Sequence, residues 1–189
     1  MLKKEARKFF QQKRDELSAA SKAKLDDLLL IQFQKIQLPF LSLVCSYYPL
    51  DEKGEMNTFI ITDYLRFRNP GLSIAYPKID ISSNTMQVIV CDEDDEFEKN
   101  AYNIPEPISC ETVAPSSIEM VLVPLLAFDK KGYRVGYGKG FYDVFLKQCS
   151  DDCIKIGFSY FDPVDVIDDA AHFDVPLNLC ITPQQAYVF

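Results

Sequence analysis

Residues 121–143 carry the strongest chemical signal in the chain, an apolar run that changes into a loop of glycines and charges. Four of the seven glycines, Gly132, Gly136, Gly138 and Gly140, lie in this loop. Glycine accepts positive φ angles and lets a ligand approach bare backbone amides. The larger apolar residues after Gly140 recur at helical spacing, which predicts a helix N-terminus whose unpaired N–H groups attract anions. The loop is therefore predicted to bind an anionic group.

Two cations and a carboxylate accompany these glycines. Arg134 can bind phosphate oxygens through two parallel N–H groups, and Lys139 supplies a mobile positive charge. Asp143 has two interpretations that the spacing leaves open: it interacts with the dipole of the predicted helix, or it is a ligand for Mg²⁺, which binds through one or two carboxylates together with substrate phosphates. Residues 136–140 do not form a Walker A loop, which needs GxxxxGK followed by Ser or Thr. They do not form a GxGxxG motif either, because Phe141 occupies the place of the last glycine. A generic nucleotide motif is not indicated.

A predicted helix that opens at Leu2 carries a stripe of basic residues, Lys3, Arg7 and Arg14. One interpretation is a solvated helix face with pairs of opposite charges four residues apart. The other is that this helix reaches a phosphate ligand. The pattern alone does not separate the two.

Composition excludes several classes of protein. The 189 residues carry a net charge of −8, and 48% of them are hydrophobic, which predicts one folded domain over residues 1–189. An acidic chain is a poor binder of nucleic acids. No apolar run approaches membrane-spanning length and no secretion signal opens the chain, so a cytoplasmic protein with no membrane partner is expected. The six cysteines are scattered without a CxxC pair, which predicts reduced structural thiols.

The remaining chain alternates strands with helices. Besides the N-terminal helix, helices are predicted from Ser18 or Ser21 to about Ile36, and from residues 55–58 to Arg66. Strands are predicted at residues 42–48, 72–76, 86–91, 154–160 and 177–182. The acidic run at 92–98 is expected to be a solvated loop or an edge connection, and residues 103–107 a proline-stiffened connector. This alternation favours an α/β layer sandwich with a largely parallel sheet, in which Glu55, Lys78 and the glycine loop follow strands and face one cleft.

Several motifs together resemble the 5-formyltetrahydrofolate cyclo-ligase family, also called methenyltetrahydrofolate synthetases. The glycine loop is similar to the family signature at Phe128, Asp129, Gly132, Arg134 and residues 136–143. The resemblance continues along nearly the whole chain, in order, through Lys3 and Arg7, residues 55–58, Pro77 and Lys78, residues 104–107, and Asp174.

This resemblance implies a three-layer α/β/α sandwich and an enzyme that uses ATP and Mg²⁺ to cyclise 5-formyltetrahydrofolate to 5,10-methenyltetrahydrofolate. It also implies a monomer that takes a small-molecule substrate with one or more glutamates on its tail. The implied catalytic residues are Arg134, Lys139 and Tyr142. The implied ATP-binding residues are Lys3, Arg7, Arg134, Gly136, Tyr137, Gly138, Lys139, Gly140, Phe141, Tyr142 and Asp143. The implied folate-binding residues are Leu50, Glu55 and residues 137–141, and the implied Mg²⁺ ligands are Asp143 and Asp174.

The chain departs from the family pattern at three positions. Leu125 stands where a glycine is usual, Phe141 replaces a tyrosine, and Tyr137 occupies a position that is often arginine. Two other classes stay open on the sequence alone: a non-catalytic folate or nucleotide binder, and a phosphosugar isomerase or transferase on a related α/β scaffold. The first is disfavoured by the intact cations and carboxylate of the loop, and the second needs a catalytic base and no ATP.

Overall fold

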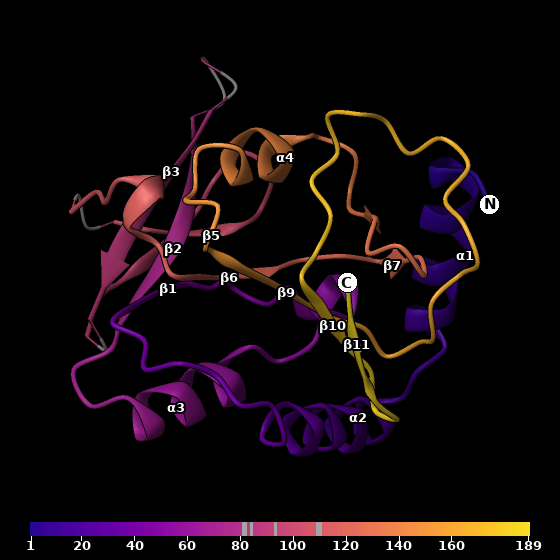
Figure 1. The fold of residues 1–189 in the computed structure, drawn as a ribbon, viewed down its shortest axis with the longest axis horizontal. Helices are drawn as coiled ribbons and strands as arrows, with labels where there is room; N and C mark the ends of the chain where they lie inside the picture. The colour runs from indigo at the N-terminus through magenta and orange to yellow at the C-terminus, as the bar shows by residue number, and fades with distance from the viewer. Residues whose placement is uncertain (81–82, 84, 93, 109–110) are drawn as a thin grey trace.

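The computed structural model describes residues 1–80, 83, 85–92, 94–108 and 111–189, which are built around a seven-stranded sheet of order β11-β10-β9-β6-β1-β2-β3 (Figure 1). The central strands run parallel to one another: β1 (Leu43–Cys45), β2 (Ser73–Asp80), β6 (Met120–Val123), β9 (Ile154–Phe158) and β10 (Leu179–Ile181). The edge strands β3 (Thr85–Cys91) and β11 (Ala186–Val188) are antiparallel to their neighbours. The largely parallel sheet predicted from the sequence is confirmed.

Helices cover both faces of this sheet, as Figure 1 shows, with α2 (Ala19–Phe33) and α3 (Phe59–Arg68) on one face and α4 (Phe141–Leu146) on the other. Ser18 caps α2, because its Oγ accepts a hydrogen bond from the Ser21 N–H at 3.1 Å. The apolar cluster on the α2 side of the sheet includes Phe33, and the cluster on the α4 side includes Phe145. Both side chains are almost inaccessible to solvent. Each such buried side chain contributes about 1.5–3 kcal/mol. The three-layer α/β/α sandwich is confirmed.

Helix α1 (Lys3–Asp15) lies beside the sandwich, where it packs on a short hairpin of β7 (Ala127–Phe128) and β8 (Arg134–Val135) (Figure 1). This hairpin leads into the glycine loop and then α4. Its turn is fixed by Asp129, which is fully buried and accepts hydrogen bonds from the N–H groups of Lys131, Tyr133 and Ile167 at 2.9–3.0 Å. A deeply buried carboxylate with three donors holds the start of the loop in place.

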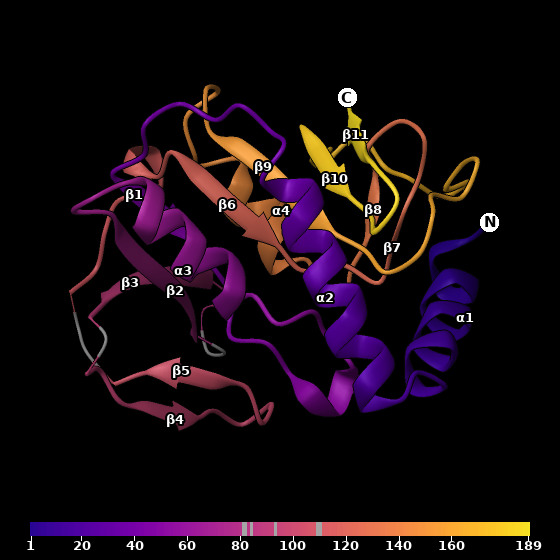
Figure 2. The ribbon, with the colours of Figure 1, turned by 90° about the horizontal axis from the view of Figure 1, so that it is seen from below.

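A second hairpin, of β4 (Phe97–Lys99) and β5 (Pro105–Pro107), lies next to β2 (Figure 2). Two 3₁₀ turns, η1 (Asp51–Lys53) and η2 (Pro115–Ser117), complete the described elements. The prediction of a connector at 103–107 was wrong, because β5 lies within it. The acidic run at 92–98, predicted as a solvated loop or an edge connection, ends in β4, and its residue 93 lies outside the described residues. Both prolines of β5 fit a strand, because the N–H groups that bond across the hairpin come from the positions between and beside them. Ile108, for example, donates to the Glu96 carbonyl.

Strand β2 is longer than predicted, because it continues through Pro77 and Lys78 to Asp80. On one side it pairs with β1 only as far as Ala75, so the missing N–H of Pro77 faces no partner strand there. The edge strand β11 was not predicted.

The cysteines at 45, 91, 149, 153 and 180 are free thiols, as expected, while Cys110 lies outside the described residues. Within the described ranges, no helix combines the length and the apolar character needed to cross a bilayer.

Candidate active site

A pocket of about 420 Å³ opens beyond the carboxyl ends of the parallel strands β1 and β6. Open α/β sheets usually bind ligands at this edge. The walls come from the segment after β1, from β2 and β3, from the β4–β5 hairpin, and from the glycine loop with the start of α4. The lining residues are Tyr47, Tyr48, Leu50, Lys53, Glu55, Pro77, Ile79, Met86, Tyr102, Ile104, Pro105, Pro124, Arg134, Gly136, Tyr137, Gly138, Lys139, Gly140, Phe141, Tyr142 and Asp143. The pocket thus unites Leu50 and Glu55 with the glycine loop, as predicted.

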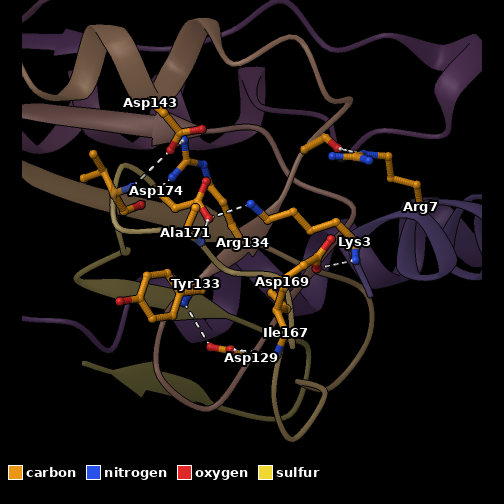
Figure 3. A network of polar contacts seen from close by, with 12 residues as sticks. Lys3, Arg7, Asp129, Tyr133, Arg134, Asp143, Ile167, Asp169, Ala171 and Asp174 are labelled. Carbon is orange, nitrogen blue, oxygen red and sulfur yellow. Dashed lines mark hydrogen bonds and ion pairs between the residues drawn. The ribbon is translucent and has the colours of Figure 1, made fainter. Parts of the chain in front are cut away.

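The glycine loop owes its shape to two left-handed residues. Gly138 and Gly140 have φ angles of 93° and 78°, which strongly favour glycine. Gly140 directly precedes α4 and leaves the first amides of that helix without a side-chain cap. Arg7 lies against the loop: its Nε donates to the Gly136 carbonyl at 2.8 Å, and a Cβ added at Gly138 would meet its guanidinium at 3.2 Å (Figure 3).

Arg134 and Asp143 form an ion pair between β8 and α4, with 2.9 Å between Nη2 and Oδ1 (Figure 3). The same Oδ1 accepts a hydrogen bond from the Val175 N–H at 3.0 Å, and the Arg134 guanidinium also donates to the Val175 carbonyl. The Arg134 side chain is only 5% exposed and that of Asp143 24%. Both contacts of the Asp143 carboxylate, from Arg134 and from Val175, use Oδ1. Its Oδ2 has no hydrogen bond to the residues that the structure describes.

Lys3 and Asp174 form a second ion pair in the same polar network, with 2.5 Å between Nζ and Oδ2 (Figure 3). Asp174 Oδ2 also accepts a hydrogen bond from the Ala171 N–H at 2.6 Å. Lys3, Arg7 and Asp174 do not line the pocket themselves; they reach the glycine loop and its neighbours from outside. The solvated-face interpretation of the basic stripe is therefore wrong, because the α1 cations contact the loop network and Arg14 is 3% exposed.

Asp143 and Asp174 are the two carboxylates that the sequence suggests as Mg²⁺ ligands. No group of three or more acidic, histidine or cysteine side chains is arranged to hold a metal within the described residues. Magnesium needs no such group, since proteins bind it through one or two carboxylates plus substrate phosphates and water. Asp143 fits this pattern, because its side chain is 24% exposed and its Oδ2 is not used by the contacts to Arg134 and Val175. Oδ2 of Asp174, in contrast, is already shared by Lys3 and Ala171.

Glu55 also lines the pocket and is 8% exposed. Its Oε2 accepts a hydrogen bond from the Leu50 N–H at 2.8 Å, and its Oε1 accepts one from the Tyr137 hydroxyl at 2.5 Å. Burial raises the pKa of this carboxyl group above its ordinary value, although the two hydrogen bonds act in the opposite direction.

Two tyrosines of the pocket, Tyr142 and Tyr102, contribute a buried hydroxyl group and a cation–π contact. The Tyr142 hydroxyl is buried and has no hydrogen-bond partner among the described residues, and burial raises its pKa well above the usual value, so it is a protonated donor. Lys139 Nζ lies 5.0 Å from the centre of the Tyr102 ring, at the tip of the β4–β5 hairpin. This cation–π contact joins the hairpin to the glycine loop.

Lys78 is a further expected residue that does not line the pocket, and several unexpected ones do. Lys78 was expected to face the cleft, but its neighbours Pro77 and Ile79 line the pocket instead. Successive side chains of a strand point to opposite faces, which directs Lys78 away. The hairpin residues Tyr102 and Ile104 were missed, since a strand rich in proline gives no strand pattern.

The chain was compared with known proteins. The profile of the 5-formyltetrahydrofolate cyclo-ligase family matches residues 2–183. A 5-formyltetrahydrofolate cyclo-ligase of Mycoplasma pneumoniae is 30% identical over 182 residues, which cover 94% of this chain and 96% of that protein. One from Mycoplasma genitalium is 28% identical over 92% of this chain and 94% of its own.

Two solved structures share the fold. The 5,10-methenyltetrahydrofolate synthetase of Aquifex aeolicus superposes with a TM-score of 0.79 at 26% identity, covering 100% of this chain and 93% of that one. The synthetase of Mycoplasma pneumoniae gives a TM-score of 0.75 at 30% identity, covering 96% and 98%. With the profile match over nearly its whole length, the chain belongs to the 5-formyltetrahydrofolate cyclo-ligase family of enzymes.

Proposed function

We propose that this enzyme cyclises 5-formyltetrahydrofolate to 5,10-methenyltetrahydrofolate with ATP and Mg²⁺, releasing ADP and phosphate. The observation that carries the proposal is that two different kinds of polar group line one pocket. A buried carboxylate, Glu55, suits the amino-rich edge of a pterin. Arg134 and the bare amides of the glycine loop suit a triphosphate.

The reaction needs two steps, because a formyl oxygen is a poor leaving group. The formyl oxygen attacks the γ-phosphorus of ATP, and the bond to ADP breaks. N10 of the same substrate then attacks the activated formyl carbon and loses its proton, and the carbon–oxygen bond breaks to release phosphate, which carries the former formyl oxygen. Since the nucleophile is already tethered, the enzyme mainly aligns the two reactants and stabilises charge on the transferring group.

The chain's own residues meet these needs as follows. Arg134 and Lys139 neutralise charge on the transferring phosphoryl group, and Tyr142 donates a hydrogen bond near it. Lys3 and Arg7 support the phosphate side of the loop from α1, while Leu50, Glu55 and residues 137–141 orient the folate. Asp143 and Asp174 would hold Mg²⁺, which would offset the charge of the phosphates. A monomeric, cytoplasmic enzyme without nucleic-acid or membrane partners is part of the same proposal.

The purified protein is expected to form the conjugated methenyl product, seen as a new near-ultraviolet absorbance band, when given 5-formyltetrahydrofolate, ATP and Mg²⁺. Reactions without ATP, or with a non-hydrolysable ATP analogue, serve as controls and should stay flat. Bound folate and nucleotide without a product band would support the non-catalytic alternative and refute the proposal.

Replacing Tyr142 by phenylalanine should separate stability from activity. An unpaired buried hydroxyl costs about 1–3 kcal/mol, so its removal is expected to leave the ligand-free protein as stable or more stable. Turnover should fall at least about tenfold, because one donor to the reacting phosphoryl group is lost. Thermal melting and steady-state kinetics measure both effects. A variant with full activity would show that the hydroxyl takes no part in the reaction.

A further inference from the structure

Arg14 of α1 is a buried cation that the proposed chemistry does not use. It is 3% exposed and its Nη2 donates to the Leu125 carbonyl, while its buried Nε has no hydrogen-bond partner among the described residues. In the part of the chain that the structure describes, Arg14 makes no ion pair. Burying a guanidinium away from water costs free energy unless a nearby polar or negatively charged group compensates for the lost hydration. The contacts of Arg14 identify that group.

A short series of contacts leads from Arg14 to the pocket. Its Nη1 lies 3.4 Å from the Tyr137 hydroxyl oxygen, which donates in turn to Glu55 Oε1 at 2.5 Å. Because the tyrosine proton goes to Glu55, its oxygen lone pairs are free to face the arginine. Arg14 does not line the pocket, whereas Tyr137 and Glu55 do. The cation therefore lies behind the two side chains that meet the ligand.

We propose that Arg14 acts through Tyr137 to keep Glu55 ionised and aligned for the pterin end of the substrate. Arg14 touches no substrate, so it is a positioning residue. This inference rests on the proposed function. An ionised carboxylate accepts hydrogen bonds at both oxygens, as a donor edge of ring N–H and amino groups requires. A protonated carboxyl group would place an O–H where an acceptor is needed.

Electrostatics around Glu55 agree with this arrangement. Burial raises its pKa, while the hydrogen bonds from Tyr137 and Leu50 and the charges of Arg14 and Lys53 lower it. The other titratable groups near Glu55 include the phenols of Tyr47, Tyr142 and Tyr160, which are neutral because burial raises the pKa of each. The Tyr160 hydroxyl donates to the Asp26 carboxylate and to the Glu55 backbone carbonyl. Removing the Arg14 charge should raise the pKa of Glu55 further. The ionised form is then lost at a higher pH, so binding weakens first on the acidic side.

The test is the pH dependence of KM for 5-formyltetrahydrofolate in Arg14→Met, Arg14→Lys and Tyr137→Phe. For Arg14→Met, the acidic limb of the KM profile is expected to move upward by about one pH unit. KM should therefore rise about tenfold on the acidic side, and the difference from the unaltered enzyme should disappear at alkaline pH. Arg14→Lys should restore the limb, because it keeps the charge. Tyr137→Phe, which is nearly isosteric, should shift the limb in the same direction. KM for ATP should stay as in the unaltered enzyme for the two Arg14 variants.

A folded Arg14→Met with an unchanged limb would overturn the inference and leave Arg14 as a fastener of α1 to the Leu125 carbonyl. If that variant does not fold, Tyr137→Phe decides, and an unchanged limb there overturns it equally. Calorimetric titration with 5-formyltetrahydrofolate measures the same limb without turnover. An unaltered protein that binds the folate with this pH dependence but does not cyclise it would contradict the proposed function and support the role of Arg14.

Discussion

Arg134→Ala is expected to lower kcat/KM by about a thousandfold, the scale of losing one preorganised donor to developing charge. Arg134 reaches the pocket from β8 with its side chain 5% exposed, so its charge acts in surroundings that screen it weakly. Its loss also leaves the Asp143 carboxylate without its cation. Steady-state kinetics with 5-formyltetrahydrofolate and ATP measure the effect.

Arg134→Lys is the matched control, because it keeps the charge but not the two-pronged geometry. Its activity should fall between those of the unaltered enzyme and Arg134→Ala. Both variants lose hydrogen bonds to Asp143 and the Val175 carbonyl, so a stability loss of about 1–3 kcal/mol is expected, with the fold kept. Near-normal turnover in a folded Arg134→Ala would show that the phosphoryl group is not handled by Arg134.

Asp143→Asn is expected to lower kcat by about a hundredfold and to raise the Mg²⁺ concentration for half-maximal rate at least about tenfold, in line with losses seen at metal sites. Asparagine keeps the size of the side chain and can still accept the hydrogen bonds from Arg134 and the Val175 N–H. The change therefore isolates the negative charge. Rates measured over a range of Mg²⁺ concentrations separate metal binding from folding.

The control for this charge removal is Asp165→Asn, at a surface carboxylate that is 87% exposed and pairs with Lys130. It should leave both the rate and the Mg²⁺ requirement unchanged. An Asp143→Asn enzyme with the ordinary Mg²⁺ requirement would return Asp143 to a purely electrostatic partner of Arg134 and α4.

Local patterns were sufficient to predict the parallel sheet and the glycine loop. The run before Pro124 is apolar on both faces, as a central parallel strand requires, and the alternating glycines mark a segment whose backbone can adopt conformations that other residues disfavour. These signals lie within a few residues of one another in the chain, so they can be read without knowing what packs beside them.

Contacts between distant segments could not be read in this way. Tyr137 and Glu55 are far apart in the sequence, and their hydrogen bond depends on how the glycine loop closes over the segment after β1. The sequence left open whether Arg14 belongs to a solvated stripe, because burial of a cation is decided by its tertiary neighbours. Lys78 was misplaced for a simpler reason, since the parity of a strand determines which side chains face a pocket.

The central claim is that the terminal phosphate of ATP is transferred to the formyl oxygen in this pocket. Turnover of 5-formyltetrahydrofolate labelled with ¹⁸O in its formyl group tests it most directly, with mass spectrometry of the released phosphate. The account predicts that the label appears in inorganic phosphate. Label released into water, with unlabelled phosphate, would contradict it.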